Sequence, residues 1–401
     1  MANEKNHKYQ LDTKCAKDIP SSEKTHSHIY PIHATSAFTY ASIDDSINVF
    51  KGKSDGFVYS RYANPTVQAV ENKLAILETH GTDTQASCIL TSSGLSAIST
   101  MALSFVSKGD AVVTQADLYG GTTELLHKVL GKAGVQIITI NLNDENELES
   151  TLQANSQVKL IYLETPTNPT LKCIDIAAVS KIAKKHDILT AIDNTFSTFY
   201  LQQPFNLGID IVIYSTTKFL NGHGNSIAGA IILKEPNQRR QVWDVMKLMG
   251  TNCNAWDAWL LHNGLKTLAV RMDRHCSNAM GIATHLEAHP KVKKVNYPGL
   301  PSHPTHTAAI KQMKQFGGML SFEIDGDFQK AVDFMNNTNL CSIAATLGNV
   351  DTLLLHPASS SHLNIPKETR QASGIEDGLI RMSVGIENPQ DLIADIDQAL
   401  D

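Results

Sequence analysis

The chain has 401 residues, of which 42% are hydrophobic and 18% are charged, a globular composition with enough length for more than one domain. Its net charge of −6 offers no positive field for nucleic acid, and no apolar run approaches the roughly 20 residues that span a bilayer. Because the N-terminus is also too polar for a signal peptide, we expect a cytoplasmic protein that binds neither nucleic acid nor membrane.

Metal and disulfide chemistry are not indicated. The six cysteines are dispersed and form no Cys-x-x-Cys pair, so we expect reduced, mostly buried thiols rather than disulfides or a zinc site. The run Thr25-His26-Ser27-His28 is interpreted as a polar loop, and no metal ligand is assigned.

Periodicity divides the chain into three parts. Residues 1–65 show little periodicity and are expected to form an N-terminal arm. After the turn at Asn64-Pro65, short apolar runs alternate with helical stretches to about residue 235, which is typical of an α/β large domain with a mostly parallel sheet, placed at residues 66–262. Residues 263–401 are expected to form a smaller α+β domain. Strands are predicted at 87–90, 111–114, 136–140, 160–163, 188–192, 211–214, 229–233, 318–324 and 379–384, and a long helical region at 256–288.

Lys218 is the first candidate for chemistry. It follows the apolar run Ile211–Tyr214 and the hydroxyl residues Ser215 and Thr217, so an amine that can bind an aldehyde cofactor lies beside groups that can bind a phosphate ester. This combination suggests pyridoxal 5'-phosphate, although an isolated Ser-x-Thr-Lys run is also compatible with an ordinary surface turn.

Asp193 ends the preceding strand-like run, Ile188–Ile192. A carboxylate at that position could keep the pyridine nitrogen of the cofactor protonated, which makes the ring an electron sink. Asp-Asn-Thr is also good helix-capping chemistry, but the nearby lysine favours the cofactor role.

Other strand ends carry suitable groups, and loops at the carboxyl ends of parallel strands are where such chemistry gathers. Gly94 and Leu95 lie in a small-residue turn that opens a helix and suits a phosphate, although it could be a plain capped helix start. Tyr119 could stack on a planar ring and move a proton, or be an ordinary core or surface tyrosine. Asn168 could hydrogen-bond the ring hydroxyl of the cofactor. Turn chemistry alone would explain the prolines in the same motif.

Taken together, these motifs resemble the Cys/Met metabolism family of pyridoxal-phosphate enzymes over nearly the full length of the chain. That family includes methionine γ-lyase, cystathionine γ-lyase, cystathionine γ-synthase and O-acetylhomoserine sulfhydrylase. The resemblance rests on Tyr59-Ser60-Arg61-Tyr62-Ala63-Asn64-Pro65-Thr66, Ser93-Gly94-Leu95, Leu118-Tyr119-Gly120, Glu164-Thr165-Pro166-Thr167-Asn168-Pro169, Asp193-Asn194-Thr195, Ser215-Thr216-Thr217-Lys218, Met272-Asp273-Arg274-His275, Tyr297-Pro298-Gly299, His356-Pro357-Ala358-Ser359 and Gly378-Leu379-Ile380-Arg381-Met382-Ser383-Val384-Gly385.

The resemblance implies the fold of the aspartate aminotransferase-like, type I PLP-dependent transferases, and it implies a role for each candidate. Lys218 would bond covalently to the cofactor and then shuttle the substrate proton, and Tyr119 would stack on the ring and protonate the departing γ-group. Asp193 would pair with the ring nitrogen, and the phosphate would be held by Gly94, Leu95, Ser215 and Thr217. Arg381 would bind the substrate carboxylate, although a lone arginine on a strand is normally solvated or salt-bridged.

The resemblance also implies an assembly. Tyr59 and Arg61 would reach the phosphate in a neighbouring subunit, so the expected unit is a dimer with shared sites, usually paired into a homotetramer.

Three positions bear on the substrate. Cystathionine-handling members of the family resemble one another in a glutamate before Ser-Leu-Gly, whereas this chain has Ala345-Thr346-Leu347-Gly348; a distal amino group would have no partner at Ala345. Thr346 keeps a hydroxyl where the family usually has serine. Methionine γ-lyases commonly carry a cysteine where this chain has Gly121, a departure from the strict lyase pattern.

We therefore expect γ-elimination on a sulfur amino acid, of the methionine γ-lyase type. The alternatives are γ-replacement on an O-acylated homoserine by a sulfhydrylase or cystathionine γ-synthase, and cystathionine γ-lyase activity. A catalytically silent PLP-binding scaffold and a plain aminotransferase of the same fold type belong to different classes; the joint presence of the lysine, ring carboxylate, tyrosine and arginine argues against the first.

Overall fold

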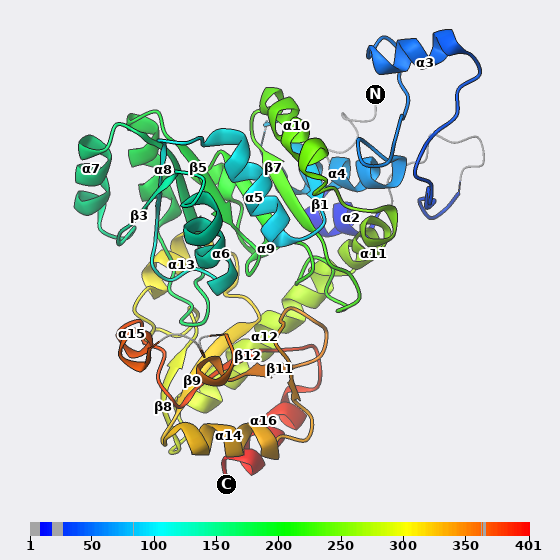
Figure 1. The fold of residues 1–401 in the computed structure, drawn as a ribbon. Coiled ribbons are helices and arrows are strands. Elements are labelled where there is room, and N and C mark those ends of the chain that lie inside the picture. The colour runs from blue at the N-terminus through cyan, green and yellow to red at the C-terminus, as the bar shows by residue number, and fades with distance from the viewer. Residues whose placement is uncertain (1–8, 18–26, 83, 362, 364–365) are drawn as a thin grey trace.

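The structure is a computed structural model that describes residues 9–17, 27–82, 84–361, 363 and 366–401 (Figure 1). A larger domain lies above a smaller C-terminal domain in Figure 1, and one long helix runs from the first into the second. The helices of the large domain and arm are α2 (Leu11–Ala16), α3 (Ile43–Phe50), α4 (Pro65–Glu78), α5 (Gly94–Phe105), α6 (Gly120–Glu124), η1 (Leu125–Leu130), α7 (Glu145–Ala154), α8 (Ile176–Lys185), α9 (Thr198–Leu201), η2 (Pro204–Leu207), η3 (Pro236–Gln238), α10 (Arg239–Met249) and α11 (Ala255–Lys266).

The large domain is built on a seven-stranded sheet with the order β1-β7-β6-β5-β4-β2-β3. Only β7 runs antiparallel to its neighbours, and the other pairs are parallel, so the mostly parallel sheet expected from the alternating pattern is confirmed. The strands are β1 (Ser87–Thr91), β2 (Ala111–Thr114), β3 (Gln136–Thr139), β4 (Val158–Glu164), β5 (Leu189–Asp193), β6 (Ile211–Ser215) and β7 (Gly229–Leu233).

Helices cover both faces of this sheet because its central strands are apolar on both faces. Ile161, Ile192 and Val212 pack with α4, α7, α8 and α11 on one face. Leu160 and Ile213 pack with α5, η1 and α10 on the other. The alternation of side chains along β4, β5 and β6 thereby decides which residues at the strand ends face α5, the helix that opens at Gly94.

The smaller domain has a five-stranded sheet with the order β10-β11-β12-β9-β8. Apolar residues of α12, α14 and α16 form one core with β8, β9, β11 and β12. The elements are α12 (Leu268–Glu287), β8 (Val292–Asn296), α13 (His306–Gln312), β9 (Met319–Ile324), α14 (Phe328–Asn337), β10 (Ser342–Ile343), β11 (Leu353–Leu355), η4 (Pro357–Ser359), α15 (Lys367–Ala372), β12 (Leu379–Ser383) and α16 (Pro389–Leu400).

The helical region expected at 256–288 is in fact two helices, α11 and α12, separated at Thr267. Thr267 leaves helical geometry (φ −107°, ψ 5°), and its N–H donates to Gly264 O three residues back. Beyond this break, Leu268 and Met272 of α12 pack in the large-domain core, whereas Ile282 and Leu286 pack in the small-domain core. One helix therefore joins the two cores.

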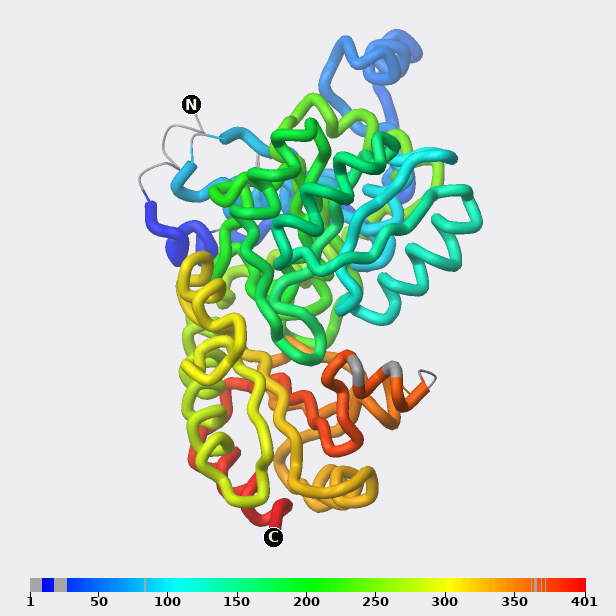
Figure 2. Tube along the Cα trace, turned by 90° about the vertical axis from the view of Figure 1, so that its left-hand side faces the viewer, coloured from blue at the N-terminus to red at the C-terminus, as the bar shows by residue number. Residues whose placement is uncertain are grey.

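The N-terminal arm has two parts. Helix α2 lies against the large domain, where Cys15 is buried and the ammonium group of Lys73 donates to the main-chain oxygens of Cys15 (2.7 Å) and Lys17 (2.9 Å). Helix α3 projects away from the body in both views (Figures 1 and 2), and its Ile43 and Phe50 side chains are exposed.

Within the described ranges, no helix is both long and apolar enough to cross a membrane. All six cysteines are buried free thiols. Across the same described residues, no group of three or more His, Cys, Asp or Glu side chains is placed to hold a metal ion; Thr25 and His26, half of the loop discussed above, lie outside them.

Candidate active site

A cavity of about 300 Å³ lies at the carboxyl ends of β4, β5 and β6, with residues of the small domain forming one wall. It brings together most of the residues selected from the sequence. Of these, Gly94, Leu95, Tyr119, Asn168, Asp193, Ser215, Thr217, Lys218, Ala345, Thr346 and Arg381 line the cavity.

Strand alternation explains why three side chains at the ends of β4, β5 and β6 face the same space. Glu164 of β4 lies directly beside Asp193 of β5 in the parallel ladder, and Asp193 lies beside Ile213 of β6. Neighbouring residues in a ladder point to the same face of a sheet, and so does Ser215, two residues after Ile213. Two carboxyl groups and a hydroxyl are therefore presented together on the α5 side.

Asp193 is a half-buried carboxyl that lines the cavity. Its Oδ1 accepts the main-chain N–H of Thr195 at 3.0 Å, an Asx-type turn rather than a helix cap, because α9 begins only at Thr198. Burial raises its pKa above the ordinary value. A cationic ring nitrogen would oppose this effect and favour the ionised form.

Lys218 lies in the turn that follows β6, and its Nζ donates to Thr346 Oγ1 at 3.0 Å. Burial, followed by the positive charge of Arg381, lowers its pKa to about 8. The neutral amine is the form that attacks an aldehyde, so this environment makes Lys218 a better nucleophile than an exposed lysine.

Arg381 of β12 is buried, and its guanidinium reaches across the cavity. One terminal nitrogen donates to Thr346 O at 2.8 Å and the other to Asn168 Oδ1 at 3.3 Å, while Nε finds no hydrogen-bond partner in the described part of the chain. Among the described residues no carboxylate forms a salt bridge with it. A buried cation with an unused donor suits the carboxylate of an amino-acid substrate.

The opposite end of the cavity suits a phosphate. Helix α5 begins at Gly94, where the first main-chain N–H groups of the helix have no intrahelical partner. A Cβ at Gly94 would lie 2.7 Å from Ser215 Cβ, so only glycine permits this close approach to the hydroxyl-bearing turn of Ser215 and Thr217. Backbone donors and hydroxyls are thus grouped as a phosphate ester requires.

Tyr119 borders the cavity beside α6, and its side chain is 48% exposed. Its main-chain N–H donates to Glu164 Oε2 at 2.8 Å. Gly121 does not itself line the cavity, but a Cβ there would lie 2.6 Å from the Tyr119 ring and 3.3 Å from Leu95 Cδ1. Gly121 is therefore placed to influence the site through the tyrosine.

Tyr59 and Arg61 do not line the cavity of their own chain. The Arg61 guanidinium donates to Lys247 O at 2.7 Å and lies 5.6 Å from the Tyr59 ring centroid and 5.1 Å from that of Tyr62. Their assignment to a neighbouring subunit's site stays a prediction.

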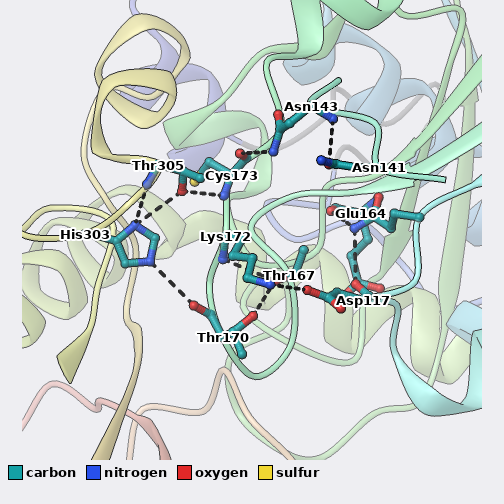
Figure 3. A network of polar contacts seen from close by, with 11 residues as sticks. Asp117, Asn141, Asn143, Glu164, Thr167, Thr170, Lys172, Cys173, His303 and Thr305 are labelled. Carbon is teal, nitrogen blue, oxygen red and sulfur yellow. Dashed lines mark hydrogen bonds and ion pairs between the residues drawn. The ribbon is translucent and has the colours of Figure 1, made fainter. Parts of the chain in front are cut away.

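The loop that carries Asn168 is braced by the polar network shown in Figure 3. Lys172 pairs with Asp117 at 2.9 Å. The main-chain N–H of Cys173 donates to Thr305 Oγ1 at 2.8 Å, and His303 approaches Thr170 O at 3.5 Å. The loop is thereby fastened to both domains at the edge of the cavity.

Sequence reasoning assigned no role to several lining residues, namely Ser93, Ile98, Glu164, Pro166, Thr195, Phe196, Ile227 and Leu347. Glu164 is the most consequential of them, because it is a buried carboxyl beside Asp193. It could have been found by the same rule that selected Asp193, since it directly follows the strand predicted at 160–163, as Asp193 follows the strand predicted at 188–192.

A lysine with a lowered pKa, a carboxyl in the cavity, a helix start that suits a phosphate and a buried arginine with an unused donor are typical of a pyridoxal-phosphate-dependent enzyme of the type I α/β fold. The family described as "Cys/Met metabolism PLP-dependent enzyme" matches residues 12–401. The chain therefore belongs to this family of lyases and transferases of sulfur amino-acid metabolism, and pyridoxal phosphate is its cofactor.

Individual relatives carry several activities. An L-methionine gamma-lyase of Fusobacterium nucleatum subsp. nucleatum is 43% identical over 374 residues, covering 92% of this chain and 93% of the relative. A cystathionine beta-lyase of Lactococcus lactis subsp. lactis is 42% identical over 392 residues, covering 98% and 99%. The crystal structure of a cystathionine gamma-lyase from Lactobacillus plantarum complexed with L-serine has a TM-score of 0.89 at 36% identity, covering 98% of each chain.

Proposed function

We propose that this enzyme carries out γ-elimination on L-methionine and yields 2-oxobutanoate, methanethiol and ammonia. The observation that carries the proposal is the distribution of charge in the cavity. Its carboxyl groups, Glu164 and Asp193, both lie at the ends of the large-domain strands, and the wall formed by Ala345, Thr346 and Leu347 has none. A thioether with an uncharged tail suits that wall, whereas a distal ammonium group would be left unpaired.

The chain's own groups divide the work. Arg381 binds the substrate carboxylate, and Lys218, held by Thr346, accepts the α-proton and returns it. Tyr119 donates a proton to the departing thiolate. Bound pyridoxal phosphate supplies the electron sink, and Asp193 holds its ring nitrogen protonated.

The cofactor contacts are part of the same proposal. Asn168 would hydrogen-bond the ring hydroxyl, and Gly94, Leu95, Ser215 and Thr217 would hold the phosphate.

Cleavage of cystathionine is the second candidate. It is favoured by the Lactococcus lactis relative, which is named a cystathionine beta-lyase and is as similar to this chain as the methionine gamma-lyases. The two candidates differ in whether the tail of the substrate carries a charge.

The deciding assay measures keto acid released by the cofactor-loaded protein from L-methionine, L-cystathionine, and O-acetyl-L-homoserine with a thiol. We expect 2-oxobutanoate and methanethiol from methionine. Turnover of cystathionine alone, or a new thioether from the acylated homoserine alone, would contradict the proposal.

A variant sharpens this assay. Ala345→Glu places a carboxylate on the uncharged wall, where it can pair with the ammonium group of cystathionine. A charge-assisted hydrogen bond is worth about 1.5–3 kcal/mol, so the ratio of kcat/KM for cystathionine to that for methionine should rise by about 10- to 100-fold. The control is Ser342→Glu, which adds the same charge at an exposed residue outside the cavity and should leave the ratio unchanged.

The assembly is proposed to be a homotetramer in which Tyr59 and Arg61 complete a neighbouring subunit's phosphate site. The positive charge of Arg61 would add to the uncharged donors at the end of the cavity that suits a phosphate. Mixing the inactive variants Arg61→Ala and Lys218→Ala should restore activity, because a hybrid dimer then contains one intact site. Absence of recovery in hybrids that form normally would contradict the shared site.

A further inference from the structure

Glu164 is a buried carboxyl at the cavity that the functions described above leave unused. It is 5% exposed and ends β4 beside Asp193. Its Oε2 accepts the main-chain N–H of Tyr119 at 2.8 Å, and the main-chain N–H of Asn168 also approaches the carboxyl and lowers its pKa, though less than that of Tyr119 does. One carboxyl group therefore contacts the backbone of two residues on different loops, both of whose side chains enter the cavity.

The main chain of Glu164 is itself held firmly. Gln115, which follows β2, donates from its side-chain amide to Glu164 O at 2.8 Å and accepts the Glu164 N–H at 3.0 Å. The same amide donates to Asp117 O at 3.1 Å, so it also ties down the loop that leads to Tyr119. The two bonds to Gln115 thus fix the main chain of Glu164 at the end of β4.

We propose that Glu164 is a positioning residue of the cofactor site: from the end of β4 it anchors the backbone of Tyr119 and Asn168, so that the phenol and the amide are held in fixed places relative to Asp193. The loops at Tyr119 and Asn168 follow different strands, and Glu164 is the side chain that bonds to both.

Glu164 performs this role as the neutral acid. Burial, and then the negative charge of neighbouring Asp193, raise its pKa well above the ordinary value, and the N–H groups of Tyr119 and Asn168 only partly oppose this. Two adjacent carboxyl groups, one buried and one half-buried, cannot both ionise without a large penalty. With the cofactor bound as proposed above, Asp193 would pair with its cationic ring nitrogen and keep the charge, so the proton would reside on Glu164.

Because Glu164 is protonated, substitution by glutamine should preserve its role. Glutamine has the shape of a neutral glutamic acid and retains an acceptor oxygen. Glu164→Gln should therefore keep the anchor, whereas Glu164→Ala leaves two main-chain N–H groups without their acceptor. Leaving buried donors unsatisfied should weaken cofactor binding by about 10- to 100-fold.

The measurement is a titration of the full-length apo-protein with pyridoxal phosphate, followed by absorbance and tryptophan fluorescence, together with a thermal melt. The matched control is Asp395→Ala. Asp395 is also a buried carboxyl that accepts main-chain N–H groups, those of Asn339, Leu340 and Cys341 at 2.7–2.9 Å, but it does not line the cavity. It should lower Tm and leave the cofactor Kd unchanged.

We expect a Kd within about 3-fold of the wild type for Glu164→Gln, with an unchanged pH dependence of the bound cofactor's absorbance, and a 10-fold or larger rise for Glu164→Ala. If Glu164→Ala lowers Tm without changing Kd, as the control does, the positioning role is wrong. If Glu164→Gln binds the cofactor as poorly as Glu164→Ala, or shifts the pH dependence, the neutral anchor is wrong. The volume-conserving Gln variant decides the question even if Glu164→Ala does not fold.

Discussion

The turn that follows Lys218 is held by the buried guanidinium group of Arg271. The residue is 3% exposed, and its guanidinium donates to Phe219 O at 2.7 Å and to Leu220 O at 3.3 Å. No carboxylate within the described part of the chain forms a salt bridge with it. A Cβ at Gly222, whose φ is +73°, would lie 2.1 Å from an Arg271 terminal nitrogen, so the turn is shaped to the arginine.

Arg271→Met removes these donors and keeps much of the side-chain volume. Among the described residues, the carbonyl oxygens of Phe219 and Leu220 accept from no backbone donor, and each buried acceptor that loses its partner costs about 1–3 kcal/mol. Part of this loss is offset because methionine needs no desolvation of a charge. We expect the free energy of unfolding to fall by about 2–4 kcal/mol.

Urea denaturation of the holo-protein at fixed protein and cofactor concentrations, followed by tryptophan fluorescence, measures this difference. The control is Arg274→Met, at an exposed position on the same helix, which should change stability by less than about 0.5 kcal/mol. If Arg271→Met is as stable as Arg274→Met, the carbonyl contacts contribute no net stability and the reasoning is refuted.

Three further predictions concern the cavity directly. Because the pKa of Lys218 is lowered to about 8 by burial and by Arg381, capture of pyridoxal phosphate by the apo-protein should accelerate as pH rises through about 8. Arg381→Met removes the neighbouring positive charge, so the midpoint of that stopped-flow profile should move to higher pH; an unmoved midpoint would contradict the assigned coupling. Gly348→Ala should reduce Tm and cofactor occupancy together, because φ is +80° and the new Cβ would lie 3.0 Å from the carbonyl carbon of Lys218; normal occupancy would show that the turn relaxes freely. Gly121→Cys should change kcat with methionine by several-fold while leaving the cofactor Kd unaltered, because its Cβ would press on the Tyr119 ring at 2.6 Å; an equal loss of cofactor binding would place Gly121 in the cofactor site instead.

Local patterns in the sequence were sufficient for the strands and for the residues at their ends. The apolar runs predicted at 111–114 and 211–214 are β2 and most of β6, because a strand buried on both faces must be apolar throughout. Lys218 and Asp193 were found because each follows a predicted strand. Parallel strands end at one edge of the sheet, so polar residues that follow different strands are brought close together.

Only the tertiary structure decided what those residues contact. Thr346 meets Lys218 from 128 positions away, and Arg381 meets Asn168 from 213 positions away. These contacts exist because residues of both domains line one cavity. The pairing of Glu164 with Asp193 likewise follows from the register of β4 on β5. Periodicity along one segment carries no information about which segment lies beside it, so the lowered pKa of Lys218 and the anchor at Glu164 arise only when the strands and domains pack together.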